Sequence, residues 1–365
     1  MEISAKITGI EYKINLSKGL KKYQFEKFDI NKAQSCSLLE DKSNIFSVSK
    51  WVSPKRTRSY PYERVYNSLA ATKRITVIPI VKDEGLEGDR DFLQWDTISL
   101  MSLLDVYVIL SYYNDAEINP SRKNKITKQK HDNDYILKKI NEIENYHSSS
   151  LHWNLKEVSQ KLPELIDKVK ESYIILEKKL GVCFHDSEGL DNFKFKILQN
   201  AETFMNFSRT KAQKAQLREV NTIQSKELLL TFTKASLTIS NYLGGKYFFT
   251  VDEALIEGNC ISLIESKHSV SNQIPSISDI KDGLLKMILF TNLNDVIIGN
   301  KVYDCKSILQ LTSLKISGII TSESSLSDLV DFFKINKLST KNINLIEKLF
   351  KEANQNGFFV IIRNS

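Results

Sequence analysis

The stretch KYFFTVDEALIEGNCISLIESKHS, residues 246–269, decides the expected fold. Two apolar runs flank Gly258 and Asn259, and such a pair between apolar runs is a two-residue β-hairpin signal. With these two residues as the loop, Asp252 lies directly opposite Glu265. Side chains that face each other across two antiparallel strands lie about 5 Å apart. The stretch therefore predicts a hairpin that brings two carboxylates together.

The same register places a lysine next to the carboxylates. Thr250 falls opposite Lys267, and side chains alternate between the two faces of a strand. Asp252, Glu265 and Lys267 are thus expected on one face, and Glu253 on the other. Two close carboxylates repel each other unless positive charge lies between them. Mg²⁺ provides such a charge, because it prefers oxygen ligands and needs only one or two protein carboxylates.

A lysine beside such a metal site can assist a metal-bound water or neutralise the charge that develops on a phosphate. The predicted face therefore suits hydrolysis of a phosphodiester. The alternative is a solvent-facing hairpin whose ion pair has no function. An acid and a lysine two residues apart occur elsewhere in the chain, for example at Glu11 and Lys13 or at Glu177 and Lys179. Only Glu265 combines this spacing with an apolar strand and a paired acid.

Asp252, followed thirteen residues later by Glu265-Ser266-Lys267, resembles the PD-(D/E)XK nuclease superfamily, in particular type II restriction endonucleases. The resemblance implies that Asp252 and Glu265 are metal ligands and that Lys267 is the catalytic lysine. Glu227 is a candidate accessory acid, with an exposed helix charge as the alternative. Val251 stands where many family members have proline.

The resemblance covers about residues 220–300 and implies an α/β fold with a mixed central sheet flanked by helices. The family core has a helix, the hairpin with the acid and the ExK sequence, a second helix and another strand. We expect these additional elements at residues 226–243 (helix), 276–293 (helix) and 295–298 (strand).

Residues 50–74 are rich in arginine, lysine and aromatic residues. Arginine suits bidentate contacts to guanine and phosphate, and tyrosine can stack on bases or bind phosphates. We therefore predict a DNA-contact segment, and the alternative is a solvated basic loop with packed aromatic residues. The predicted DNA-binding residues are Lys55, Arg56, Arg58, Tyr60, Arg64, Lys73 and Arg74.

Two other polar segments have less specific signals. The acidic stretch 83–96 is a candidate second metal site, but no lysine follows at the ExK spacing. A structural loop, or a DNA-recognition loop that uses Arg90, is the preferred interpretation. The lysine-rich stretch 122–130 is interpreted as a solvated linker, or as a segment that follows a phosphate backbone. His268 is expected to be structural.

The length of 365 residues suggests two or three domains. We expect an α/β DNA-recognition region at 1–117, a polar lysine-rich linker at 118–150, and a helical segment plus the nuclease core at 151–365. Within the first 181 residues, the pattern predicts strands at 7–16, 75–81 and 106–110, and helices at 98–104, 135–146 and 165–180. The remainder of 151–245 is also expected to be mostly helical.

Composition narrows the classes of protein. The net charge of +7 permits nucleic-acid binding but does not require it. The four cysteines form no CxxC pair, so we expect reduced thiols in a cytoplasmic protein. No signal peptide and no long apolar run is present, so no membrane partner is expected. The P-loop, GxGxxG and GxSxG sequences are absent, which disfavours an NTPase, a dinucleotide enzyme and a serine hydrolase.

The sequence therefore predicts a Mg²⁺-dependent endonuclease that cuts double-stranded DNA at specific sites in a restriction system. Cutting both strands with one site per chain favours a homodimer, whose two-fold symmetry matches a palindromic target. One alternative is a nuclease of the same superfamily in DNA repair, recombination or transposition. Another is a DNA-binding protein without catalysis.

Overall fold

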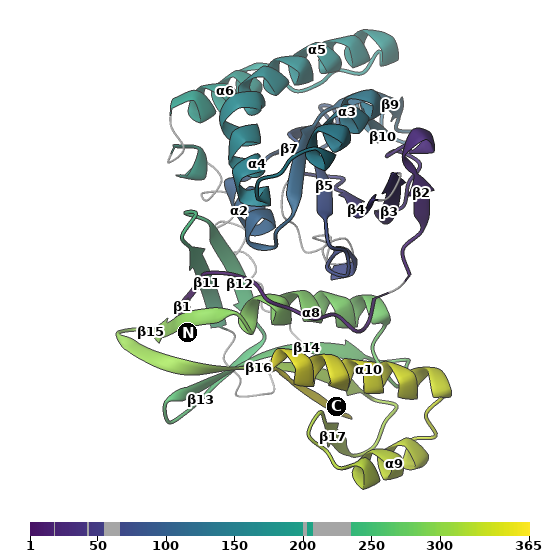
Figure 1. The fold of residues 1–365 in the computed structure, drawn as a ribbon, viewed down its shortest axis with the longest axis vertical. Coiled ribbons are helices and arrows are strands. Elements are labelled where there is room, and N and C mark those ends of the chain that lie inside the picture. Colours follow the sequence, from purple (N-terminus) through teal and green to yellow (C-terminus); the bar gives the residue numbers. More distant parts are fainter. Residues whose placement is uncertain (18, 42–43, 55–65, 200–202, 207–234) are drawn as a thin grey trace. The chain divides into compact units, whose positions relative to one another are not determined.

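The computed structural model describes residues 1–17, 19–41, 44–54, 66–199, 203–206 and 235–365 (Figure 1). The chain forms two compact units, each of mixed α/β structure. Unit 1 consists of Met1–Lys18 together with Ala212–Ser365, and unit 2 consists of Gly19–Lys211. The α/β class expected from the sequence is confirmed, and the two units are described separately below.

Unit 1 is built on a mixed sheet whose strand order is β12-β11-β1-β15-β16-β14-β13, with β18 paired to both β16 and β17. Strand β1 joins the middle of this sheet, parallel to β11 and antiparallel to β15. The strands are β1 (Glu2–Ile7), β11 (Ala235–Asn241), β12 (Lys246–Val251), β13 (Glu253–Glu257), β14 (Cys260–Ser269), β15 (Leu293–Ile298), β16 (Lys301–Ser313), β17 (Ile319–Thr321) and β18 (Phe359–Asn364).

Three helices complete the described part of unit 1, and each begins at a serine that caps its first turn. The side chains of Ser276, Ser325 and Ser339 accept hydrogen bonds from backbone N–H groups that would otherwise lack a partner. The N-terminal segment after β1 runs along the first of these helices in Figure 1, and it forms hydrogen bonds with Asn292, just after that helix, and with Glu352 of the last helix. The helices are α8 (Ile277–Phe290), α9 (Leu326–Ile335) and α10 (Thr340–Asn356).

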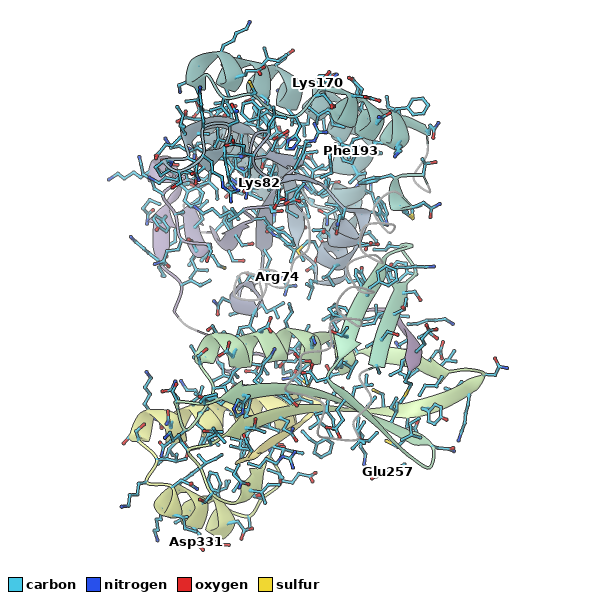
Figure 2. All side chains as sticks on the ribbon, turned by 180° about the vertical axis from the view of Figure 1, so that it is seen from behind. Arg74, Lys82, Lys170, Phe193, Glu257 and Asp331 are labelled. Atoms are coloured by element: carbon cyan, nitrogen blue, oxygen red, sulfur yellow. The ribbon has the colours of Figure 1, made fainter. Side chains whose placement is uncertain are left out.

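The predicted hairpin is present. Strands β13 and β14 pair antiparallel around Gly258 and Asn259, with Glu253 opposite Ile264 as expected (Figure 1). Figure 2 shows Glu257 at the turn end of this hairpin. The register is thus specified by the turn and by the apolar alternation of the two strands.

The helix that follows the hairpin is also present, since α8 spans most of residues 276–293. The segment 295–298 lies in β15, as expected for a strand. The strand that pairs in parallel with β14 is β16, however, and not β15. The chain therefore returns from α8 through the β15–β16 hairpin before it reaches the neighbour of β14.

Unit 2 contains a sheet of order β2-β3-β4-β5-β8 and two small antiparallel pairs, β9–β10 and β6–β7. Its strands are β2 (Lys22–Gln24), β3 (Cys36–Asp41), β4 (Asn44–Lys50), β5 (Arg74–Pro79), β6 (Val81–Asp83), β7 (Arg90–Phe92), β8 (Tyr107–Ser111), β9 (Tyr113–Ile118) and β10 (Ile126–His131). Its helices are the 3₁₀ turn Phe25–Lys27, α2 (Trp95–Leu103), α3 (Asn133–Glu144), α4 (Ser150–Lys156), the π-helical turn Glu157–Lys161, α5 (Leu162–Leu180) and α6 (Glu188–Gln199).

Several local predictions for unit 2 are confirmed. Strands β5 and β8 and helices α2, α3 and α5 lie within a few residues of the predicted positions. Helix α5 ends at Gly181, which adopts a left-handed conformation with φ of 65°. Glycine carries no Cβ, so it adopts this conformation at the end of a helix without steric cost.

The predicted linker at 118–150 is wrong. This stretch contains β10 and α3, and Ile136, Ile140 and Ile143 of α3 are fully buried in the core of unit 2. Their spacing of four and three residues places them on one face of a helix. The chain therefore divides near residues 18 and 212 and not within 118–150, because the first strand of unit 1 pairs with strands more than two hundred residues away.

Two further predictions of secondary structure are corrected. The end of the predicted helix at 226–243 is strand β11, in which Ala235, Leu237 and Ile239 are buried and alternate with less buried residues. This period of two is that of a strand, and the parallel pairing with β1 satisfies its backbone. Of the predicted strand at 7–16, only Ile7 lies in a strand, because β1 ends at this residue. Among the described residues, no helix is long and apolar enough to cross a membrane.

Candidate active site

The predicted site residues lie where β12 gives way to β13, beside the strand β14. Glu265 and Lys267 belong to β14, and Asp252 immediately precedes β13. The Oδ2 atom of Asp252 accepts a hydrogen bond of 2.9 Å from the backbone N–H of Ser266. This bond holds the Asp252 carboxylate next to β14, so the structure brings together the three residues that the sequence predicted.

The detailed pairing differs from the prediction. The ladder between β13 and β14 ends at Glu253 and Ile264, so Asp252 reaches β14 through its side chain and not through a strand pair. Thr250 does not lie opposite Lys267, because it belongs to β12 and pairs with Ser236 of β11. The chain bends at Asp252 and passes from one strand partner to another.

Glu265 is the centre of the site. Its side chain is only 2% exposed, and an ammonium group contacts each of its oxygens. The Nζ atom of Lys267 lies 2.9 Å from Oε1, and the Nζ atom of Lys286 lies 2.6 Å from Oε2. Each lysine has a second acceptor, which is Asp282 at 2.6 Å for Lys267 and the backbone oxygen of Thr250 at 2.9 Å for Lys286.

Helix α8 supplies two charged residues that sequence reasoning missed. Asp282 and Lys286 are four residues apart, so they lie on the same side of the helix, one turn from each other. Gly283 between them allows the helix to approach the sheet, since a Cβ there would lie 2.6 Å from Leu309 Cδ1. The spacing was a usable signal, but only the packing of α8 shows which strand the two side chains face.

Burial and charge act in opposite directions on this cluster. Burial raises the pKa of Glu265, Lys286 opposes this rise, and the nearby Asp252 adds to it. For Lys267, burial favours the neutral amine, but Glu265 and Asp282 outweigh burial and raise the pKa of the ammonium. Lys267 is therefore positively charged across the physiological range and can act on a negative phosphate.

The donor set suits a hard divalent cation. Asp252 and Glu265 provide carboxylate oxygens, and Mg²⁺ uses one or two such groups and fills its other positions with water. The two ammonium groups around Glu265 already show that its oxygens attract positive charge. Within the part of the chain that the structure describes, no group of three or more His, Cys, Asp or Glu side chains could hold a metal ion. A magnesium site here would therefore rest on these two carboxylates.

The predicted DNA-contact segment is only partly described. Lys55, Arg56, Arg58, Tyr60 and Arg64 lie outside the described residues, and so does Glu227.

Two of the predicted DNA-binding residues, Lys73 and Arg74, are described, and both make contacts within unit 2. Lys73 donates to the carbonyl oxygens of Ile143 (2.6 Å) and Glu144 (3.3 Å) at the end of α3. Arg74, labelled in Figure 2, forms an ion pair of 3.5 Å with Asp105. Both side chains thus tie β5 to neighbouring segments of unit 2.

The acidic stretch 83–96 forms a structural turn around Asp83. Asp83 is 3% exposed, and its carboxylate accepts a hydrogen bond from the backbone N–H of Gly85 (2.9 Å) and contacts the ring Nδ1 of His185 (2.8 Å). Arg90 donates to the backbone oxygen of Asp186 at 2.6 Å. The contacts join this stretch to the segment before α6, in agreement with the structural interpretation.

Comparison with known proteins does not identify the chain. No family model, no curated protein and no solved structure matches it.

Proposed function

We propose that this protein is a Mg²⁺-dependent endonuclease that cuts double-stranded DNA, of the type II restriction kind. The observation that carries the proposal is the buried carboxylate of Glu265, held beside Asp252 and in direct contact with Lys267. Carboxylates of this kind are rarely buried unless they are paired or bind metal. The hairpin and the helix α8 also follow the order expected for the nuclease family, and a strand parallel to β14 comes after them, although it is β16 and not the expected segment 295–298.

Each residue of the cluster has a role in this reaction. Asp252 and Glu265 would hold Mg²⁺, which when bound would lower the pKa of a water and polarise the phosphate. Lys267 presents its ammonium to the phosphate and stabilises the negative charge that builds up as the water attacks. Asp282 positions Lys267 by accepting one of its hydrogen bonds.

The recognition of DNA is assigned to the basic segment 50–74 of unit 2. Arginines there supply contacts to phosphates and guanines. A second copy of the chain supplies the second active site, because each chain carries one cluster and a double-strand cut requires two.

The test is incubation of the purified protein with plasmid and phage DNA of mixed sequence, in Mg²⁺ and in EDTA. We expect discrete bands that require Mg²⁺. A Lys267→Ala variant should cleave on the order of 10²–10³-fold more slowly. The matched control is Lys348→Ala, which removes one exposed lysine from α10 of the same unit and should cleave like the wild type.

The other outcomes separate the alternatives. A smear that requires Mg²⁺ and Lys267 would support a nuclease of repair or recombination and contradict the restriction role. Binding of duplex DNA without cleavage in any lane would support a DNA-binding protein. Cleavage that survives Lys267→Ala would contradict the assigned active site.

A further inference from the structure

The strongest unassigned feature is the second lysine at the buried carboxylate. Lys286 lies on α8, outside the Asp252 and ExK sequences, yet its 2.6 Å contact with Glu265 is shorter than the 2.9 Å contact of Lys267. With Lys267 on Oε1 and Lys286 on Oε2, both oxygens of Glu265 are in contact with an ammonium. A metal ion that binds Glu265 therefore meets an ammonium at either oxygen, and the repulsion between the two cations favours the departure of one lysine.

The second acceptors show which ammonium is anchored beside Glu265 by another carboxylate and which has no second ion pair to hold it there. Lys267 is tied to a second carboxylate, Asp282, at 2.6 Å. Lys286 is tied to a neutral backbone oxygen, that of Thr250, at 2.9 Å. If Lys286 releases Glu265, its ammonium keeps this hydrogen bond, and its side chain, which is 19% exposed, also reaches water. The release therefore does not leave a buried ammonium without a partner.

We propose that Lys286 is a built-in counter-ion, which holds Oε2 of Glu265 until a divalent cation displaces it. This inference rests on the proposed function, in which Asp252 and Glu265 bind Mg²⁺. Without metal, Lys286 compensates the buried negative charge and keeps the carboxylate in place. With metal present, Lys286 competes for the same oxygen and weakens binding. The site then needs a higher concentration of the cation than it would without this lysine, so Lys286 is a positioning residue that sets the metal requirement.

The test is a titration of the full chain with Mn²⁺, followed by calorimetry and by the electron paramagnetic resonance signal of free Mn²⁺. We expect Lys286→Met to bind Mn²⁺ at least tenfold more tightly than the wild type, which corresponds to about 1.4 kcal/mol. Lys286→Gln keeps a donor for Thr250 without the charge and should also bind more tightly. Lys286→Arg keeps the charge and should bind like the wild type. Lys348→Met is the matched control and should have no effect.

Stability provides a second readout that a purely structural lysine would not give. In EDTA, Lys286→Met should melt at a lower temperature than the wild type, because it leaves Glu265 with one counter-ion. Saturating Mn²⁺ should raise the melting temperature of the variant more than that of the wild type, since the metal replaces the lost charge.

The outcomes distinguish the two proposals. Unchanged or weaker Mn²⁺ binding by folded Lys286→Met and Lys286→Gln would overturn the counter-ion role. The proposed function would stand in that case if wild-type protein cleaves DNA and Asp252→Asn abolishes Mn²⁺ binding. If the wild type neither binds Mn²⁺ nor cleaves DNA, the proposed function fails, and the counter-ion role fails with it.

Discussion

Two buried glutamates, one in each unit, both need a positively charged partner inside the protein, but the surroundings of the two ion pairs differ. Glu265 in unit 1 is 2% exposed and contacts Lys267 and Lys286. Glu157 in unit 2 is 3% exposed and contacts Lys139 at 2.9 Å. Burial raises the pKa of both carboxyl groups. Each acid therefore depends on its lysine partners to remain ionised inside the protein.

The difference between the two sites is access. Lys139 is 7% exposed, and its ammonium lies 5.3 Å from the centre of the Trp153 ring. Among the described residues, Oε2 of Glu157 finds no hydrogen-bond donor. The lysines at Glu265 have second acceptors, as Lys139 has in Glu142 at 2.8 Å, but they are 17% and 19% exposed. A buried ion pair that is covered by an aromatic ring stabilises the fold, whereas one whose lysines reach water can also bind a ligand.

The largest expected effect is at the closed pair. Lys139→Met leaves the Glu157 carboxylate without its counter-ion, and breaking a buried pair in this way costs about 3–5 kcal/mol of the free energy of unfolding. Urea unfolding followed by tryptophan fluorescence measures this, since all three tryptophans, Trp51, Trp95 and Trp153, belong to unit 2.

The control for this variant is Lys138→Met on the same helix, where the lysine is exposed. A loss below about 0.5 kcal/mol, the size of an ordinary surface substitution, for Lys139→Met would show that the closed pair contributes little to stability. The Glu157–Lys139 pair could then no longer serve as the example of an ion pair that stabilises the fold.

An intermediate effect is expected from a buried group that stays neutral. Burial, aided by the Lys50 ammonium, lowers the pKa of His131 to about 3. The unfolded chain has a histidine pKa of about 6.5, so between these values the unfolded state binds more protons. The contribution of His131 to the free energy of unfolding is therefore largely present above pH 6.5 and is lost as the pH falls below it. Between pH 7 and 5 we expect unit 2 to lose about 2 kcal/mol through His131.

The measurement is urea unfolding by tryptophan fluorescence at both pH values. His131→Gln should remove most of this difference because glutamine does not titrate. An equal loss in wild type and variant would mean that His131 is accessible to protons in the folded state.

The smallest effect is expected at a third buried carboxylate. Glu352 in unit 1 is fully buried and accepts hydrogen bonds from the Tyr12 hydroxyl (2.9 Å) and from the backbone N–H groups of Asn15 (2.6 Å) and Leu16 (3.0 Å). Tyr12→Phe removes one hydrogen bond to a fully buried carboxyl group, while the ring can still stack on Phe358. We expect a loss of about 1.5 kcal/mol.

Hydrogen exchange of the α10 amides measures this loss, because unit 1 contains no tryptophan. Tyr303→Phe in the same unit is the control and should leave the exchange rates unchanged. Equal protection in both variants would indicate that the Tyr12 hydroxyl contributes little to the stability of this buried acid.

Local signals predicted the parts of the fold and site that depend on neighbouring residues. Gly258 and Asn259 specified the hairpin and its register, and the serine at 276 marked the start of α8. The proximity of Glu265 and Lys267 follows from the alternation of side chains in one strand. Asp252 was also predicted to lie near them, although it arrives through a bend and not through the ladder.

The remaining features depend on contacts between distant segments. The sequence of the predicted helix at 276–293 did not show that Lys286 would contact Glu265, because this contact depends on how α8 packs on β14. The strand character of 235–241 depends on pairing with β1, which tertiary structure provides and local propensity does not. Lys73 looked like a DNA contact in sequence, and only the position of the α3 end shows its acceptors.

The central position of β1 in the sheet of unit 1 has a consequence for synthesis. Ile3 pairs with Leu237, and Ile7 pairs with Leu293. The ribosome adds about 5–20 residues per second, so β1 waits for its first partner for roughly 10–50 s. All of unit 2 emerges in that interval and can fold before unit 1. During this time the apolar face of β1 lacks its strand partners and can bind a chaperone. The yield of folded protein in the cell should therefore depend on chaperone binding.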